Sequence, residues 1–149
     1  MAQLMINLPV NKLKQMKKTF TLPLIFFALL LSSFGIAQNT SGIDDVISAL
    51  KAGNANELAK FIDDDSGMEV ALPDKSNSYS KSQAVMVLKD FFSNNGVKNF
   101  EVKFKGDKGN GQFCVGTLQT RSGNFRTHIY MKTVGNKQVI RDIKFQSVE

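Results

Sequence analysis

The sequence contains very few of the side chains that most catalytic and metal sites use. Among its 149 residues there are one cysteine, one histidine and no tryptophan. A single cysteine excludes an intramolecular disulfide. Cys114 lies in a strand-like segment, where a buried small hydrophobic residue is more common than a reactive thiol. One histidine without a cysteine cluster cannot supply the usual zinc ligands, so we expect no metal site and no cofactor.

Long apolar runs are also absent, except near the start of the chain. Four lysines precede an apolar segment over 20–31, and small residues follow at Gly35 and Ala37. This order of charge, apolar core and small-residue cleavage site is typical of a secretory signal peptide. We therefore expect residues 1–37 to be removed, with Met16 as an alternative start, and the protein to be periplasmic or extracellular. The run is short for a membrane span, so we expect no stable membrane insertion after cleavage; a retained anchor is the alternative.

The excess of positive charge is small once this segment is set aside. Four of the 19 basic residues and none of the 13 acidic residues lie before Gln38, which leaves 15 basic and 13 acidic residues, a net charge of +2. This balance removes the main argument for a nucleic-acid partner, and we expect none. The remaining residues 38–149 have the length of one domain with one core.

The pattern of apolar residues predicts helices first and strands afterwards. Apolar residues recur at helical spacing over 43–50 and over 84–92, and a shorter helix follows Asn54. Ser80 and Gln83 form a predicted capping box at the start of the longest helix. A short strand is expected over 68–72, followed by a polar loop over 74–78. From Phe100 to Phe145, four segments of alternating or apolar residues are separated by Gly- and Asn-rich turns, which predicts an antiparallel meander. The predicted fold class is therefore α+β: four long strands plus a short strand, packed on about three N-terminal helices.

Several short motifs resemble an uncharacterised family of small secreted bacterial domains. They are Tyr79–Ala84, Leu88–Phe92, Phe104–Gly106, Gly116–Thr120 and Ser122–Arg126. That family is similar to the nuclear-transport-factor-2-like superfamily, which has a cystatin-like fold in which a curved antiparallel sheet forms a cone around a long helix. The resemblance implies this fold from about Ile43 to Phe145. It implies no reaction, because the superfamily contains isomerases and dehydratases as well as binding and dimerisation modules.

Strand alternation places a set of candidate binding residues on one face of the predicted sheet. Phe125, Thr127, Ile129 and Met131 share one parity, so Arg126, His128, Tyr130 and Lys132 share the other. The resemblance implies that acid–base residues of the superfamily's enzymes lie inside the cone, and His128 is expected on the opposite face. Lys103, Lys105 and Arg121 are expected to extend this basic, partly aromatic face. It is either a binding face for an acidic partner or a solvated surface.

Arg141 is a further candidate, because it shares strand parity with the apolar residues Val139, Ile143 and Phe145. A guanidinium that points inward needs a partner, either among Asp63, Asp64 and Asp65 or on a ligand. The alternative, which we favour, is a β-bulge after Ile140 that shifts the register.

No catalytic residue can be assigned from these patterns. We expect a non-catalytic binding or assembly module whose partner is an unknown protein, an acidic envelope component or a second copy bound through the sheet face. The alternative is an enzyme or carrier for a small hydrophobic ligand inside the cone, with proton transfer by Asp90, Glu69 or Tyr79. In a binding module the cone is instead expected to be filled by Phe91, Phe92, Phe104 and Phe113.

Overall fold

Residues 42–149 are described in a computed structural model, and they belong to one compact unit. The unit contains three helices and six strands in the order α2 (Ile43–Ala52), α3 (Ala55–Ala59), β1 (Met68–Leu72), β2 (Lys75–Tyr79), α4 (Lys81–Asn95), β3 (Val97–Lys108), β4 (Gly111–Thr120), β5 (Gly123–Val134) and β6 (Lys137–Val148). The predicted signal peptide lies outside the described residues. Within residues 42–149, no helix combines the length and the apolar character that a membrane crossing requires.

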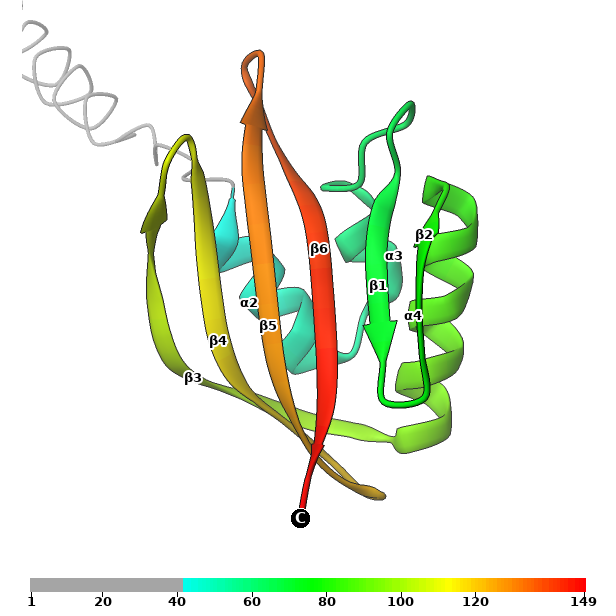
Figure 1. The fold of residues 1–149 in the computed structure, drawn as a ribbon. Helices are drawn as coiled ribbons and strands as arrows, with labels where there is room; N and C mark the ends of the chain where they lie inside the picture. Colours follow the sequence, from blue (N-terminus) through cyan, green and yellow to red (C-terminus); the bar gives the residue numbers. More distant parts are fainter. Residues whose placement is uncertain (1–41) are drawn as a thin grey trace, which may run out of the picture. The chain divides into compact units, whose positions relative to one another are not determined.

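The strands form one curved sheet in the order β2-β1-β6-β5-β4-β3 (Figure 1). All neighbours are antiparallel except β1 and β6, which run parallel and make the sheet mixed. The predicted four-strand meander and the short strand before it are confirmed. The predicted loop over 74–78 is wrong, because most of it forms β2, which pairs with β1 in a hairpin. β2 is a largely exposed edge strand without an apolar alternation, so the sequence pattern carries no strand signal there.

The helices begin and end where the local sequence predicts. The side chain of Asn54 caps α3 by accepting hydrogen bonds from the backbone N–H groups of Asn56 and Glu57 at 3.1 and 3.2 Å. At the start of α4 the capping box is present, and the backbone N–H of Ser80 donates to Gln83 Oε1 at 3.2 Å. Gly96 ends α4 with a φ of 68°, a left-handed conformation that glycine adopts without strain.

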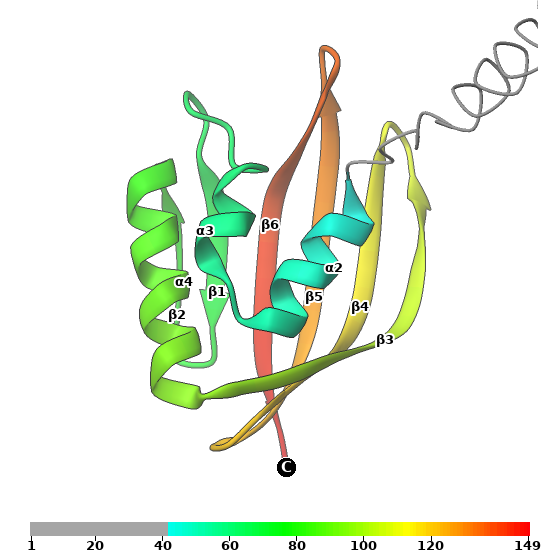
Figure 2. The ribbon, with the colours of Figure 1, turned by 180° about the vertical axis from the view of Figure 1, so that it is seen from behind.

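The three helices all lie on the same face of the sheet, which we call the inner face (Figure 2). α2 contacts β3 and β4, whereas α4 contacts β1 and β2. Between the helices and the sheet lies a single core of buried apolar side chains. Its largest fully buried members are Phe100, Phe145, Leu50, Leu58, Leu88, Leu118, Ile129, Met131, Ile140 and Ile143. The opposite face of β3–β6, which we call the outer face, is covered by none of the helices of residues 42–149 (Figure 1).

Phenylalanines of α4 attach this helix to the middle of the sheet. The ring centroid of Phe91 lies 5.1 Å from that of Phe125 on β5 and 4.6 Å from that of Phe145 on β6. Phe92 meets Phe145 edge-on at 6.1 Å. Such offset and edge-on pairs add to the free energy already gained by burying the rings. The prediction that Phe91 and Phe92 fill the cone is confirmed.

We expect Phe91→Ala to lower the free energy of unfolding by about 3–5 kcal/mol, because it removes a buried ring and leaves a cavity. Met86→Ala on the same helix is the matched control: Met86 is 65% exposed, so its loss is expected to cost less than about 0.5 kcal/mol. Urea unfolding followed by circular dichroism measures both changes. Equal effects of the two substitutions would contradict this packing.

Candidate functional site

The candidate residues on β5 lie on the outer face, as their strand parity predicts. Phe125, Thr127, Ile129 and Met131 are buried on the inner face. The side chains of Arg126 and Lys132 are exposed, and those of His128 and Tyr130 are half-buried on the opposite side. His128 is therefore separated from the helix-covered core by the sheet itself.

A β-bulge at Lys103 changes which residues of β3 join this face. Val102 is paired with Gly116 and Phe104 with Val115, so Lys103 is the extra residue of the strand. Because of this extra residue, Phe104 shares the outer face with Val115, and it is 60% exposed. The prediction that Phe104 fills the cone is wrong for this reason.

The same bulge sends Lys105 to the inner face, opposite Cys114. There its ammonium group forms an ion pair with Asp44 of α2, with 2.7 Å between Nζ and Oδ1. The expectation that Lys105 extends the basic outer face is therefore wrong. Arg121 lies at the end of the β4–β5 hairpin, with its guanidinium against Gly96 after α4, and its backbone N–H donates to the Gly96 carbonyl at 2.9 Å.

Aromatic rings gather on the outer face where β3, β4 and β5 meet. The rings of Phe104 and Phe113 lie 5.5 Å apart, and Phe113 is directly opposite Tyr130, so the prediction that Phe113 fills the cone is also wrong. Glycines of the neighbouring strand make room for them: a Cβ at Gly106 would lie 3.1 Å from the Phe113 ring, and a Cβ at Gly111 would lie 2.9 Å from the Tyr130 ring.

Next to these rings the outer face is hollowed into a pocket of about 440 Å³, which we call the outer pocket. Side chains and backbone of β3, β4, β5 and β6 line it: Lys108, Phe113, Cys114, Val115, His128, Ile129, Tyr130 and Asp142. Phe113 and Val115 supply apolar surface, and four residues supply polar groups. This combination, an apolar lining with a few convergent polar groups, is typical of ligand sites.

The imidazole of His128 and the carboxyl of Asp142, which both line the outer pocket, have shifted pKa values. Partial burial lowers the pKa of the His128 imidazole, and the nearby cations Arg126 and Lys144 lower it further. Partial burial also raises the pKa of the Asp142 carboxyl, with a smaller contribution from the negative charge of Glu69. His128 is therefore a neutral hydrogen-bonding group at neutral pH.

Cations surround the outer pocket without being paired to acids. Lys108, Arg126, Lys132 and Lys144 form no ion pair with any acidic side chain of the described chain, whereas Lys103 is paired with Glu101 at 2.6 Å. Sequence reasoning named Arg126 and Lys132 but missed Phe113, Val115, Lys144 and Asp142. Strand parity on β4 would have found Val115, since Cys114 and Leu118 mark the buried side.

Arg141 lies at a β-bulge, as the favoured alternative predicts. Tyr130 is paired with Asp142 and Met131 with Ile140, so Arg141 is the extra residue of β6. Its side chain is exposed, and Nη1 donates to Ser66 Oγ at 3.0 Å. The inward guanidinium of the other alternative is thereby excluded, and Arg141 is not among the residues that line the outer pocket.

Two of the three consecutive aspartates before β1, Asp63 and Asp64, have side-chain partners. Asp63 Oδ1 accepts hydrogen bonds from the backbone N–H and the hydroxyl of Ser66 at 2.7 and 2.8 Å, which lowers the pKa of this carboxyl. Asp64 forms an ion pair with Lys81 at 2.9 Å. Over residues 42–149 no group of His, Cys, Asp and Glu side chains has the geometry to hold a metal ion.

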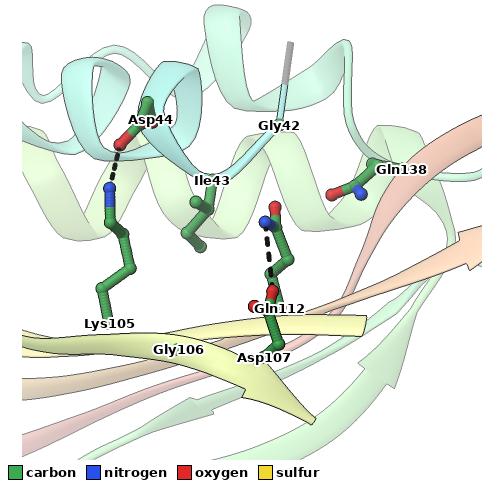
Figure 3. A pocket seen from close by; sticks show the side chains of 8 residues that line it. All are labelled: Gly42, Ile43, Asp44, Lys105, Gly106, Asp107, Gln112 and Gln138. Carbon is green, nitrogen blue, oxygen red and sulfur yellow. Dashed lines mark hydrogen bonds and ion pairs between the residues drawn. The ribbon is translucent and has the colours of Figure 1, made fainter. Parts of the chain in front are cut away.

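The inner side of the sheet has a different, polar pocket beside the start of α2 (Figure 3). Its volume is about 370 Å³, and its lining includes the Lys105–Asp44 ion pair and a hydrogen bond of 3.4 Å from Gln112 to Asp107. Gln138 Oε1 is buried beside it without a hydrogen bond from any described residue. These polar contacts do not fit a hydrophobic ligand.

The residues predicted for proton transfer inside the cone do not line the pocket of Figure 3. Asp90 is exposed on α4. Glu69 is exposed and is paired with Asp142 in the register of β1 and β6, on the outer face, where it accepts a hydrogen bond from Ser76 at 3.1 Å. Tyr79 is half-buried and packs against the core. The expectation of an inward carboxylate at Asp90 or Glu69 is therefore wrong.

Comparison with solved structures identifies the class of fold. The chain is similar to a nuclear-transport-factor-2-like protein of unknown function from Cytophaga hutchinsonii, with 10% identity over 71% of this chain and 86% of that one and a TM-score of 0.52. It is also similar to a de novo designed protein with a curved β-sheet, with 11% identity, coverage of 70% and 95%, and a TM-score of 0.56. These likenesses show the fold, which is nuclear-transport-factor-2-like.

The family follows from closer matches. The family described as "Domain of unknown function (DUF4783)" matches residues 43–146. A family protein from Bacteroides uniformis is 33% identical over 74% of this chain and 99% of that one, with a TM-score of 0.68. A second, from Bacteroides ovatus, is 31% identical over 70% and 94%, with a TM-score of 0.66. The chain therefore belongs to the DUF4783 family, which confirms the predicted resemblance. None of the functionally curated proteins matches it significantly.

The thiol of Cys114 is expected to be inert in the folded protein. It is fully buried, and burial raises its pKa to about 11. We expect it to react with an aromatic disulfide reagent about 100-fold or more slowly than an exposed cysteine at about pH 8, and to become reactive in denaturant. Ser78→Cys, at an exposed position of β2, provides the reactive control in the same molecule. Fast labelling of Cys114 in the folded wild type would show that the strand opens.

His128 is expected to make stability depend on pH. Because its pKa in the folded protein lies below its ordinary value of 6.5, the unfolded chain binds more protons in that interval, and the free energy of unfolding rises as pH increases through it. His128 is the only histidine, so His128→Gln should remove this slope between about pH 5.5 and about pH 7. Urea titrations at several pH values measure it. An unchanged slope in the variant would refute the shifted pKa.

Proposed function

We propose that this domain is an exported, non-catalytic binding or assembly module that acts through its outer face. The observation that supports this most directly is the combination, on the outer face, of unpaired cations with the exposed ring of Phe104 and the half-buried rings of Phe113 and Tyr130. Exposed aromatic side chains and arginine are enriched in the binding surfaces of proteins, whereas a purely solvated face does not need them. The export of the module is inferred only from the sequence of residues 1–37.

The charge of the outer face favours an acidic partner. Lys108, Lys132, Arg126 and Lys144 outnumber the acidic groups near them, Asp142 and Glu69, once the Lys103–Glu101 pair is set aside. A complementary negative surface steers the encounter and fixes the orientation of the complex, and its effect weakens with salt. An acidic protein or another acidic component of the cell envelope has this chemistry.

The filled interior supports a binding role over catalysis. Phe91, Phe92 and Phe145 occupy the space between α4 and the sheet, and the polar pocket beside α2 holds an ion pair. General acid–base catalysis requires a proton-transfer group within hydrogen-bond reach of an enclosed substrate. The titratable groups with such potential, His128 and Asp142, lie on the open outer face instead.

The outer face could instead bind the outer face of a second copy of the chain. Sedimentation over a wide concentration range tests this form of assembly. A dimer that Tyr130→Glu disrupts would support it, because Tyr130 lies near the middle of the outer face. A monomer at every concentration would exclude it and leave the acidic heterologous partner.

Charge reversal tests the acidic partner with a matched control. We expect Arg126→Glu combined with Lys144→Glu to weaken binding to poly-glutamate at low salt by about tenfold or more, which corresponds to ~1.4 kcal/mol. Lys51→Glu combined with Lys89→Glu changes the net charge equally but alters exposed residues of α2 and α4. This control should weaken binding by less than about threefold. Fluorescence anisotropy measures both, and equal losses would show that only net charge matters.

A further inference from the structure

The outer pocket has features that a general basic surface does not explain. Its volume of about 440 Å³ is near the lower end of the range for small-molecule sites, and its apolar lining comes from Phe113 and Val115. The rings of Phe113 and Tyr130 extend over Gly106 and Gly111. Pairing of charges across a surface does not require a pocket, whereas burial of an apolar side chain of a partner does.

Polar groups around the hollow have unused hydrogen-bonding capacity. The side chains of Lys108, His128, Tyr130 and Asp142 form no hydrogen bond with any residue of the described part of the chain. Asp142 is half-buried, and a half-buried carboxylate that accepts no hydrogen bond gains free energy from a donor such as a peptide N–H. The hollow thus offers an apolar surface beside an acceptor that lacks a donor.

The register of the sheet places cations on both sides of this hollow. Phe113, Tyr130 and Asp142 form one cross-strand row, and Val115, His128 and Lys144 form the next. Lys108 and Lys132 flank Gly111 in the row beyond Tyr130. Arg126 lies two residues beyond His128 at the other end. From Lys132 to Arg126 the strand covers about 20 Å, which is the length of an extended segment of about six residues.

We propose that the outer pocket binds one aromatic side chain of an acidic polypeptide segment. Carboxylates on one side of this aromatic residue pair with Lys108 and Lys132, and carboxylates on its other side pair with Arg126 and Lys144. The segment can run in either direction along the strands. A backbone N–H or a side-chain hydroxyl of the segment donates to Asp142. The inference deepens the proposed function and rests on it, since it specifies what the acidic partner contains.

The central carboxylate favours a polypeptide over a surface of phosphate groups. Asp142 and Glu69 are neighbours across β1 and β6, so a phosphate placed over the hollow would meet two negative charges at close range. A peptide instead puts a neutral ring and a backbone amide there and keeps its carboxylates near the flanking cations. Binding at the apolar lining is also favourable only if the bound group excludes water from this lining.

Three short synthetic peptides separate the aromatic anchor from the charge. The first has a phenylalanine flanked by two aspartates on each side, the second replaces the phenylalanine with alanine, and the third replaces the aspartates with lysines. We expect the first to bind at least about fivefold more tightly than the second, a difference of ~1 kcal/mol, and the third not to bind measurably. Amide chemical shifts of the isotope-labelled protein measure the affinities and the location. The first peptide should shift Val115, His128 and Tyr130.

Each outcome decides one part of the inference. Equal binding of the two acidic peptides at the outer face would overturn the aromatic anchor but leave the acidic partner intact. No shift on the outer face with either acidic peptide would overturn the proposed function as well. Tighter binding to phosphatidylglycerol vesicles than to phosphatidylcholine vesicles, with displacement of the first peptide, would replace the polypeptide partner by a membrane surface.

A pair of tryptophan substitutions tests the pocket directly. Val115→Trp places a large ring in the hollow and should abolish the advantage of phenylalanine over alanine. Gln119→Trp lies on the same strand and the same side, four residues away, and should preserve that advantage. Thermal unfolding confirms that both variants are folded. If Val115→Trp does not fold, the shift map of the wild-type protein still decides, since shifts confined to Arg126 and Lys144 would exclude the pocket.

Discussion

The packing of Phe91 between Phe125 and Phe145 is the contact on which the arrangement of this domain depends. It fixes α4 against β5 and β6 in the middle of the sheet, in addition to the contacts that this helix makes with α3, β1 and β2. The phenylalanine rings fill the volume between α4 and the middle of the sheet. All three helices of residues 42–149 lie on this side (Figure 2), and none of them covers the opposite face of the four long strands (Figure 1).

Two single-residue bulges determine which side chains appear on that uncovered face. Without the extra residue at Lys103, Phe104 would point toward the core and Lys105 toward the outer face. The bulge reverses the faces on which these two side chains lie. The extra residue Arg141 in β6 similarly allows Ile140 and Ile143 to be buried together, and it places Asp142 opposite Tyr130 on the outer face. A one-residue shift reverses every side chain that follows it, so each bulge changes the chemistry of the surface as well as its curvature.

Where apolar and polar residues alternate regularly, the sequence is sufficient to predict on which face of the sheet each side chain lies. Phe125, Thr127 and Ile129 alternate with polar residues without interruption, and the structure confirms their parity with that of His128. Phe104 was misplaced because a bulge leaves no signature in a period-two pattern that continues to alternate after it. Arg141 was recognised because two consecutive apolar residues, Val139 and Ile140, break the alternation visibly. β2 was missed because an exposed edge strand has no buried side to create a pattern. The outer pocket depends on register across four strands, which a single sequence does not reveal.

A domain with a filled interior can still present a specific site if its sheet carries one on the outside. The floor of such a site is the sheet, whose backbone groups are already hydrogen-bonded, so its side chains are held by strand geometry and do not depend on loops. Cross-strand rows fix the spacing of the cations on either side of Phe113 and Val115, and the glycines beside the rings of Phe113 and Tyr130 leave space for these side chains to extend along the surface. Such a face is ordered before a partner arrives, and this reduces the conformational entropy lost on binding. The rigidity that the phenylalanine core gives to the sheet is therefore also what makes its outer face suited to recognition.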